Sequence, residues 1–223
     1  MHIDPEIRAG LRVGFPLVPA TLLGGISFGV LAQPVMGSIA PVLMSLFVFS
    51  GAAQFAALTV LATGGGALAA ILAGMLLNAR WLPMGLAIGP FLKGGRLQRS
   101  VESTAIVDAS FALASRGDGT YDRERLIGST LPQFFAWSAG TLIGVLGGSL
   151  LGDPKALGLD AMFPAFFAVL LFSELRDRVR ITAAALGAGI AFLLMPFTPA
   201  GIPVVAAACA ALIGLKQARR VAA

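Results

Sequence analysis

Long apolar runs constrain this chain more than any other feature of its sequence. Almost no charged residue interrupts the runs at 13–33, 41–63, 66–92, 128–151 and 181–196. Each run except the last is about 20 residues or more, the length with which an α-helix crosses roughly 30 Å of hydrocarbon. Only 12% of the residues are charged, whereas soluble domains carry roughly a quarter. The sequence therefore predicts an all-α, polytopic transmembrane helical bundle with about seven to eight spans.

Charged residues gather between the apolar runs and exclude several kinds of function. The 16 basic and 11 acidic residues give a net charge of +5, and their placement is typical of loops at a membrane surface, not of a nucleic-acid footprint. His2 is the only histidine, which excludes a Ser–His relay or a histidine metal site at membrane depth. Cys209 is the only cysteine, so an intrachain disulfide is impossible. We expect a lipid bilayer around the chain, with no cofactor, no metal and no nucleic-acid partner.

Two apolar blocks of similar length indicate an internal repeat. An offset of 123 residues aligns several glycines and a proline in register. The aligned pairs are Gly24 with Gly147, Gly25 with Gly148, Gly29 with Gly152 and Pro41 with Pro164. We expect one membrane domain, 1–223, with repeat halves 13–99 and 126–220 joined by a polar middle segment, 100–125. Duplications of this kind build many secondary transporters, and coincidence is the alternative in so skewed a composition.

The apolar runs are interrupted at corresponding points of the two halves. Residues 50–54 (S-G-A-A-Q) correspond to the polar stretch 173–178, and residues 78–83 (N-A-R-W-L-P) correspond to the proline-rich stretch 196–203. Such breaks free backbone groups that lipid cannot satisfy, so they persist only where protein or a water-filled cavity covers them. Paired breaks of this kind predict broken helices and a substrate site near the repeat interface.

The topology has two solutions, which differ in the polar middle segment. If residues 100–115 span the membrane, eight helices result, both termini lie inside, and Lys93, Arg96 and Arg99 violate the positive-inside tendency. If that stretch lies at the surface, about seven spans remain and the N-terminus faces outward. Glu102 and Asp108 within this short stretch leave both solutions open.

Arg80 and Asp108 are candidate functional residues because a charge at membrane depth is costly. Arg80 lies about a dozen residues from either end of its run, roughly 18 Å along a helix, which is farther than an arginine side chain can snorkel. A cation there costs at least ~2.5 kcal/mol, so it should face a cavity or a carboxylate. Asp108 is suited to pair with Arg80, to bind a substrate ammonium or to carry a coupled proton. The alternatives are a span that ends early at Pro83 and a solvated Asp108 on a surface helix.

Small and polar residues at the first break are further candidates. Ser50, Gln54 and Asn78 supply hydrogen-bond donors and acceptors beside Gly51, which allows backbone or ligand to approach closely. A half-helix that begins here would direct its N-terminal N–H groups at an anionic group such as a carboxylate. The alternative is helix–helix packing with interhelical hydrogen bonds.

Several of these residues stand in motifs that resemble those of the AzlC family of branched-chain amino-acid permeases. F-S-G-A-A-Q-F stands at residues 49–55, and N-x-R stands at residues 78–80. The family's D-E-[ST]-F-A resembles residues 108–112, where Ala109 replaces the usual acidic residue. Residues 137–144 and 158–165 resemble two further motifs, W-x-x-G-T-x-x-G and G-[LM]-D-F-A-x-P-A. The resemblance covers most of the chain.

The resemblance implies the large subunit of a bacterial inner-membrane exporter for leucine, isoleucine, valine and often methionine. It also implies a separate small AzlD-type membrane subunit as partner. The chain has no nucleotide-binding motif, so we expect a secondary transporter driven by the proton gradient. The alternative is an ion or small-solute channel, in which the glycine-rich breaks would line a continuous pore. An enzyme is not expected, because a serine nucleophile would find neither histidine nor lysine within the spans.

Overall fold

The computed structural model describes residues 5–148, 178–198 and 202–211, together with single residues between them (161, 165, 168, 171, 172 and 175). In this part of the chain the regular structure is helical, with one isolated β-bridge between Ser115 and Tyr121. The predicted all-α class is therefore confirmed there. The chain divides into two compact units. The first comprises Met1–Gln54 and Asn78–Pro154, and the second comprises Phe55–Leu77 and Lys155–Ala223.

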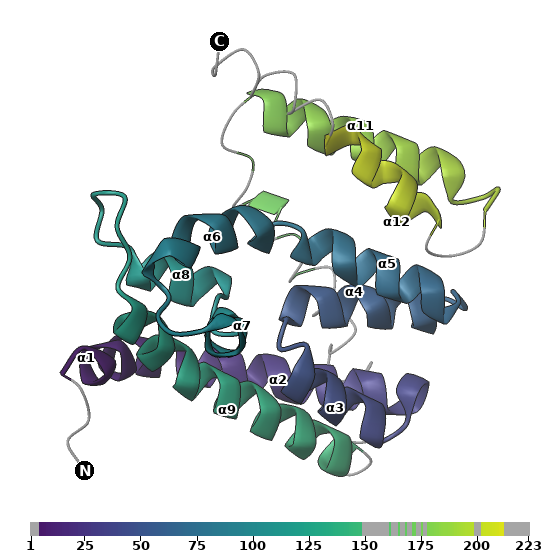
Figure 1. Ribbon diagram of the computed structural model, residues 1–223. Helices are drawn as coiled ribbons and strands as arrows, with labels where there is room; N and C mark the ends of the chain where they lie inside the picture. Colours follow the sequence, from purple (N-terminus) through teal and green to yellow (C-terminus); the bar gives the residue numbers. More distant parts are fainter. Residues whose placement is uncertain are drawn as a thin grey trace. The chain divides into compact units, whose positions relative to one another are not determined.

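The first unit is built around two long helical rods (Figure 1). Its helices are α1 (Pro5–Gly14), η1 (Phe15–Leu17), α2 (Val18–Met36), α3 (Ile39–Phe47), α6 (Trp81–Ile88), η2 (Gly89–Phe91), α7 (Arg96–Ser103), α8 (Asp108–Ala114) and α9 (Arg123–Gly147). The first turn of α4 (Gly51–Ala62) also belongs to it. One rod is the continuous series α1, η1 and α2, and the other is α9, which packs against α1 and α2.

The second unit contains the remainder of α4, most of α5 (Ala67–Asn78), and the C-terminal helices α11 (Arg178–Leu194), α12 (Ile202–Ala207) and η5 (Ala208–Ala211). Within this unit α11 packs against α12 and η5. Gly187 marks the close approach, because a Cβ added there would lie 3.3 Å from the carbonyl oxygen of Ala207. The contact of α11 with α12 thus depends on a small residue.

One described helix is long and apolar enough to cross a membrane by itself. It is the rod Pro5–Met36, whose 32 residues at 1.5 Å each extend about 48 Å, more than the hydrocarbon thickness. A second candidate arises if α5 and α6 are joined across their short break. The first unit also exposes large apolar side chains, among them Phe15, Phe47 and Phe135, and a surface of this kind is suited to lipid or to a partner. The number of spans, seven to eight, stays a prediction.

Residues 100–115 do not form one spanning helix. α7 ends at Ser103 and α8 begins at Asp108, and the four residues between them are not helical. Neither helix has the roughly 20 residues that a span needs. The solution with eight spans required one continuous helix here, and the described structure has two short helices instead. Ile106 and Ala114 of this stretch form a buried apolar cluster with Ile88 of α6 and Leu126 of α9.

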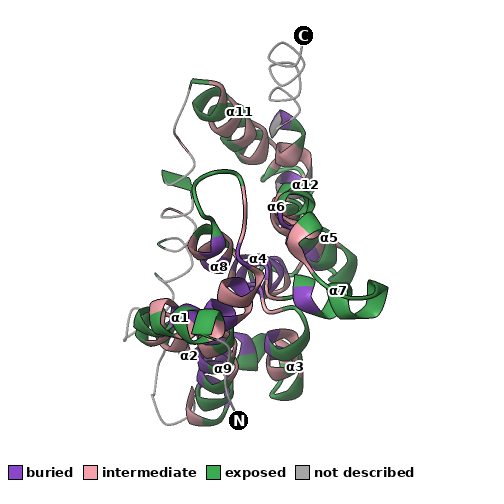
Figure 2. Cartoon of the chain, turned by 60° about the vertical axis from the view of Figure 1, so that its left-hand side comes forward, coloured by how far each residue is buried: buried purple, intermediate pink, exposed green. Residues whose placement is uncertain are grey.

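Glycines hold the two rods of the first unit together. Buried residues of α9 recur at every third or fourth position, so one stripe of the helix is covered (Figure 2). At Gly25 and Gly29 of α2, and at Gly140 and Gly144 of α9, an added Cβ would lie closer than 3.2 Å to backbone atoms of the opposite helix. Both pairs have the G-x-x-x-G spacing that brings membrane helices into close backbone contact. Gly10 and Gly128 make the same kind of contact between α1 and α9.

The second half of the predicted repeat, 126–220, is described only in part, because most of residues 149–177 and all of 212–220 are not described. The repeat halves, 13–99 and 126–220, therefore stay a prediction. The break expected at 196–203 is present in part, since α11 ends at Leu194 and a turn follows over residues 195–198. The break expected at 173–178 falls mostly on residues that are not described.

The close approach of the rods predicts unequal effects of two glycine substitutions in α9. Gly144→Ala should lower the thermal midpoint of the purified protein, because its Cβ would overlap the Ile26 carbonyl oxygen and overpacking costs typically 1–3 kcal/mol. Gly147→Ala is the matched control, since an added Cβ there meets nothing within 4 Å. Thermal unfolding in detergent measures both variants. Equal midpoints would contradict the packing role of Gly144.

Candidate functional site

The first break in the apolar runs separates α3 from α4. Phe49 occupies the left-handed region with φ of +43°, a conformation that costs a residue with a Cβ roughly 1–2 kcal/mol. Ser50 then caps α4, because its Oγ accepts a hydrogen bond of 3.4 Å from the backbone N–H of Ala53. The interruption predicted at residues 50–54 is therefore present, and its non-helical part lies at 48–50.

A hydrogen bond connects this break with the second one. The Ser50 hydroxyl donates to Oδ1 of Asn78 at 2.6 Å. Asn78 ends α5, and Ala79 and Arg80 form a turn before α6 begins. The predicted interruption at residues 78–83 is thus present as well. Ser50 and Asn78, which we expected to face a solute, are hydrogen-bonded to each other through these side-chain atoms.

Gln54 takes part in a closed ring of buried hydrogen bonds. Trp137 Nε1 donates to Gln54 Oε1 at 3.0 Å, and Gln54 Nε2 donates to Ser45 Oγ at 2.9 Å. Thr141 uses its hydroxyl hydrogen on the Trp137 carbonyl oxygen (3.0 Å), so the 2.8 Å bond between Ser45 and Thr141 is donated by Ser45. The ring begins and ends on Trp137, and Ser45, Gln54 and Thr141 are 0% exposed. It joins α3, α4 and α9.

The indole of Trp137 fits between two glycines. A Cβ added at Gly24 of α2 or at Gly51 of α4 would lie 2.9 Å from its ring atoms. The ring also stacks on Phe28, with centroids 6.3 Å apart. Gly51, which was predicted to allow close approach of backbone or ligand, therefore provides room for a side chain of α9.

Arg80 and Asp108 form the ion pair that the sequence suggested as one possibility. Arg80 Nε donates to Asp108 Oδ1 at 3.0 Å, and its terminal nitrogen donates to Oδ2 at 2.7 Å. This two-pronged geometry is the strongest that an arginine and a carboxylate can form. The side chains are 29% and 50% exposed, so solvent screens the pair and it adds at most about 1 kcal/mol to stability. The pair joins the turn before α6 to the first residue of α8, and its exposure allows water to replace either partner.

A cavity of about 790 Å³, open to the surface, lies on the first unit beside both breaks, and its wall residues Phe47 and Val101 are 82% and 63% exposed. Apolar side chains dominate its wall: Leu46, Phe47, Val48, Phe49, Trp81, Val101, Ala105, Ile127, Leu131 and Phe134. Glu102, Ser103, Thr104 and Thr130 supply the polar atoms. The ring of Phe49 meets that of Phe134 edge to face, with centroids 5.1 Å apart. The volume falls within the range of roughly 300–1,000 Å³ that is usual for small-molecule sites.

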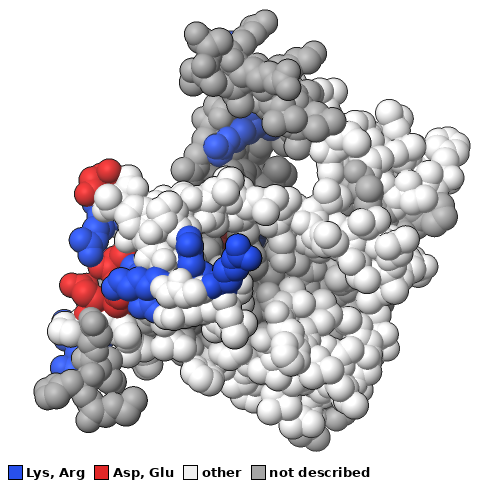
Figure 3. Space-filling view, in the orientation of Figure 1, with Lys and Arg blue, Asp and Glu red and all other residues white. Residues whose placement is uncertain are grey.

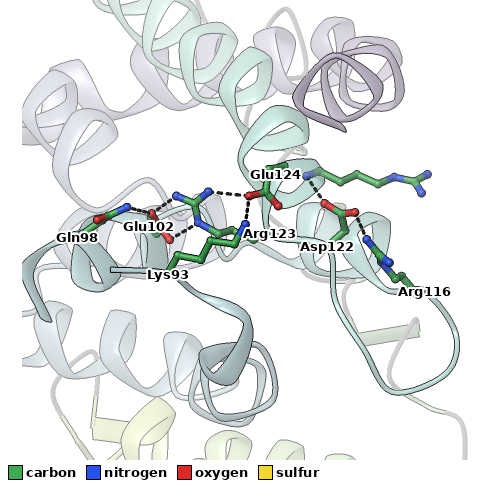
Figure 4. Close-up of polar contacts among 8 residues, drawn as sticks. Lys93, Gln98, Glu102, Arg116, Asp122, Arg123 and Glu124 are labelled. Carbon is green, nitrogen blue, oxygen red and sulfur yellow. Dashed lines mark hydrogen bonds and ion pairs between the residues drawn. The ribbon is translucent and has the colours of Figure 1, made fainter. Parts of the chain in front are cut away.

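A network of charged residues borders this cavity (Figure 4). Arg123 donates to both carboxylate oxygens of Glu102 and also to Glu124 Oε1, at 3.0 Å, and Lys93 donates to the same Glu124 oxygen at 2.8 Å. The bond from Arg123 is the largest cause that lowers the pKa of Glu102 to about 2, against the opposing effect of burial, and a bond from Gln98 adds to it. Glu102 is therefore an anion at any physiological pH.

A second group of charges caps α9. Asp122 accepts hydrogen bonds from the Arg125 backbone N–H at 2.8 Å and from Arg116 at 2.6 Å. Burial raises the pKa of Asp122, but these two bonds outweigh it, and the pKa lies below its usual value. On the face drawn in Figure 3 the charged side chains of the first unit gather over this end, while the surface over α3 is white. The charged end and the apolar body of the unit are thus separated, as at a membrane surface.

Two of the six residues predicted from sequence, Ser50 and Arg80, adjoin residues of the cavity wall in the chain. Phe49 precedes Ser50, and Trp81 follows Arg80 in the chain. None of the six predicted residues (Ser50, Gly51, Gln54, Asn78, Arg80 and Asp108) belongs to the cavity wall of the described structure. Sequence reasoning also missed Glu102 as a site residue. The signal that could have identified Glu102 was a carboxylate in the short polar segment that separates two apolar blocks.

The closed ring predicts a stabilising role for Gln54 that is separable from transport. Gln54→Leu should lower the free energy of unfolding by about 1–3 kcal/mol, because the Trp137 N–H loses its acceptor and Ser45 loses its donor in a buried place. Gln133→Leu is the control, since within the described structure the Gln133 side chain donates to the carbonyl of Ser129 on its own helix, at 2.8 Å. Chemical or thermal unfolding in detergent compares the two. A larger loss for Gln133→Leu would contradict the ring.

The chain matches the AzlC protein family over residues 16–151. This stretch contains both breaks, the closed ring, the Arg80–Asp108 pair and the cavity wall. No solved structure matches the chain.

Curated relatives are similar over most of the chain. An "uncharacterized membrane protein" of Archaeoglobus fulgidus is 32% identical over 87% of this chain and 88% of its own length. The "inner membrane protein YgaZ" of Escherichia coli is 28% identical, over 84% of this chain and 82% of its own. The "branched-chain amino acid transport protein AzlC" of Bacillus subtilis is 24% identical, over 85% and 78%. The family match covers more than half of the chain, and these relatives are named as membrane or transport proteins, so the chain belongs to the AzlC family.

Proposed function

We propose that this chain is the large subunit of a bacterial inner-membrane exporter for leucine, isoleucine, valine and methionine, driven by the proton gradient. The observation that carries the proposal is an apolar-walled cavity of about 790 Å³ at a broken helix, in a chain of the AzlC family. The name of the Bacillus subtilis relative supports this substrate class. A multi-pass position in the inner membrane is part of the proposal, as is a small AzlD-type membrane subunit.

The cavity is suited to an aliphatic side chain. Leu131 and Phe134 of α9 face it together with residues 46–49 at the end of α3. Burial of apolar surface against such a wall contributes roughly 25 cal/mol per Å², so leucine gains more than alanine from the same site. The discrimination is expected to be modest, since each methylene is worth only about 1–3 kcal/mol in a hydrophobic pocket. Apart from Glu102 the wall offers an ion little but apolar side chains, which favours a site for an aliphatic solute over an ion pore.

The Arg80–Asp108 pair is our proposed coupling element. Arg80 lies in the turn before α6, next to the cavity residue Trp81, and Asp108 is the first residue of α8. Protonation of Asp108 would remove one charge of the pair and free the Arg80 guanidinium. Because the pair contributes little to stability when exposed, it can open and close at low cost. Such a pair is suited to link proton movement to a rearrangement at the break between α5 and α6.

A cavity-filling substitution tests the substrate site. Leu131→Trp should reduce efflux of labelled leucine at least about tenfold, because the larger ring occupies the space for the aliphatic side chain. Leu142→Trp is the matched control, since Leu142 lies on the same helix, is exposed, and is absent from the cavity wall. Cells that express equal amounts of each variant are loaded with leucine and efflux is followed. Equal efflux from both variants would remove the cavity from the proposal.

Counterflow in the same preparation separates a carrier from a pore. Unlabelled leucine on the opposite side accelerates uptake through a carrier with alternating access, and it has no such effect on a channel. Acceleration in the unaltered protein is the expected result. Its absence, together with persistent leucine flux, would favour the channel.

The coupling role predicts a separable defect for Asp108→Asn. This variant should keep leucine counterflow, which needs no net proton movement, and should lose most of the leucine gradient that a proton gradient drives. Asp118→Asn is the control, because Asp118 is an exposed loop carboxylate that accepts hydrogen bonds from Thr120. Proteoliposomes with an imposed pH gradient measure both activities. Loss of both activities in Asp108→Asn, or of neither, would contradict the coupling role.

A further inference from the structure

Glu102 is the only ionisable residue among the described residues that line the cavity. Its side chain is 7% exposed, and it is followed in the chain by two hydroxyl residues, Ser103 and Thr104, that also line the cavity. The remaining wall is apolar except for Thr130 and Trp81, the two other residues with a polar side-chain atom. The polar atoms are therefore concentrated, and their donor and acceptor character decides which group of a solute they would bind.

This polar end offers acceptors. The Ser103 hydroxyl donates its hydrogen to the Ser100 carbonyl oxygen at 2.7 Å, and the Thr104 hydroxyl donates to the Val101 carbonyl oxygen at 2.7 Å. Both hydroxyl hydrogens are thus in use, and the oxygens retain lone pairs. Glu102 is a carboxylate and can only accept. An ammonium group has three donors and no acceptor, so it complements this arrangement.

Trp81 contributes a donor without a described acceptor. Its Nε1 is buried and has no hydrogen-bond partner among the described residues, although Trp81 forms part of the cavity wall. A buried N–H without an acceptor costs about 1–3 kcal/mol. A solute carboxylate that reaches this nitrogen through a small movement of the side chain would supply the acceptor and remove this cost. The same wall therefore has a complement for each charged group of an amino acid.

We propose that the cavity is a zwitterion site, in which Glu102 binds the α-ammonium group of an aliphatic amino acid and the Trp81 indole N–H donates to its α-carboxylate. The aliphatic side chain then lies against Leu131 and Phe134. This assignment rests on the proposed function and names the residues that recognise its substrate. It distinguishes an amino acid from an aliphatic amine and from an aliphatic keto acid.

The charges around the cavity favour a ligand of zero net charge. Glu102 and Glu124 are balanced by Arg123 and Lys93 in the bonded network, so the network is neutral (Figure 4). An amine would add a positive charge to a partly buried place, and a keto acid would add a negative charge, each with a desolvation penalty. A zwitterion adds neither. The low pKa of Glu102 keeps its carboxylate charged throughout the physiological range.

Counterflow of labelled leucine in proteoliposomes tests the assignment with a set of competitors. The competitors are unlabelled leucine, 4-methyl-2-oxopentanoate, which lacks the ammonium group, and 3-methylbutylamine, which lacks the carboxylate. The unaltered protein should be inhibited by leucine at much lower concentration than by either analogue. Glu102→Gln should reduce the ratio of affinities for leucine and the keto acid about tenfold or more, the effect of a lost charged hydrogen bond.

Two further variants make the result specific. Glu124→Gln removes the other carboxylate that bonds Arg123 but does not line the cavity, so its selectivity should equal that of the unaltered protein. Trp81→Phe keeps an aromatic ring and loses the N–H, so it should narrow the preference for leucine over the amine by about threefold or more. It also tests the site independently if Glu102→Gln does not accumulate.

The outcomes separate this inference from the proposed function. Leucine counterflow with an unchanged leucine-to-keto-acid ratio in Glu102→Gln, or with equal shifts in Glu102→Gln and Glu124→Gln, would overturn the zwitterion site and leave the transporter. An unchanged leucine-to-amine ratio in Trp81→Phe would overturn the carboxylate contact. Unaltered protein that shows no leucine counterflow would overturn the proposed function, and the site with it.

Discussion

The close backbone contact between the two rods of the first unit is the constraint on which its other features depend. Gly25 and Gly29 meet Gly140 and Gly144, and side chains with a Cβ cannot occupy these positions without moving a helix. In a bilayer, apolar side chains gain little by leaving lipid, so close packing must supply the stability that burial supplies in water. The contact also fixes the rotation of α9, and with it the directions of Trp137, Thr141 and the cavity residues.

The broken helix is held by polar atoms that use the position of α9. The ring of bonds through Gln54, Ser45, Thr141 and Trp137 satisfies side-chain donors and acceptors within protein. This answers the requirement that lipid imposes on polar groups at membrane depth. Packing therefore explains part of the F-S-G-A-A-Q-F motif. Its glycine, Gly51, leaves room for the Trp137 indole, and its glutamine, Gln54, connects Trp137 with Ser45 in the hydrogen-bonded ring. The cavity lies at the preceding residues, whose apolar side chains make its wall.

Features that depend on local sequence could be predicted, and features that depend on distant contacts could not. The helical class, the breaks at Ser50 and Asn78, and the suitability of Arg80 and Asp108 as partners all follow from apolar runs and from the cost of charge in lipid. The partner of Gln54 could not be identified, because Trp137 is 83 residues away and no spacing rule connects them. From the sequence, Glu102 bears only on the question whether residues 100–115 span the membrane. Its place in the cavity wall depends on residues of α7, α9 and the end of α3, which lie far apart in the chain.

The backbone at Phe49 has a consequence for the mechanics of the cavity. Its left-handed conformation is disfavoured for a side chain with a Cβ, yet the ring it carries forms the wall of the cavity and leans on Phe134. A wall residue inside a regular helix would have a favourable backbone conformation, whereas the backbone conformation of Phe49 costs roughly 1–2 kcal/mol. The side chain in the cavity wall and the disfavoured backbone conformation between α3 and α4 thus belong to one residue, so a displacement of this ring would act on the break itself.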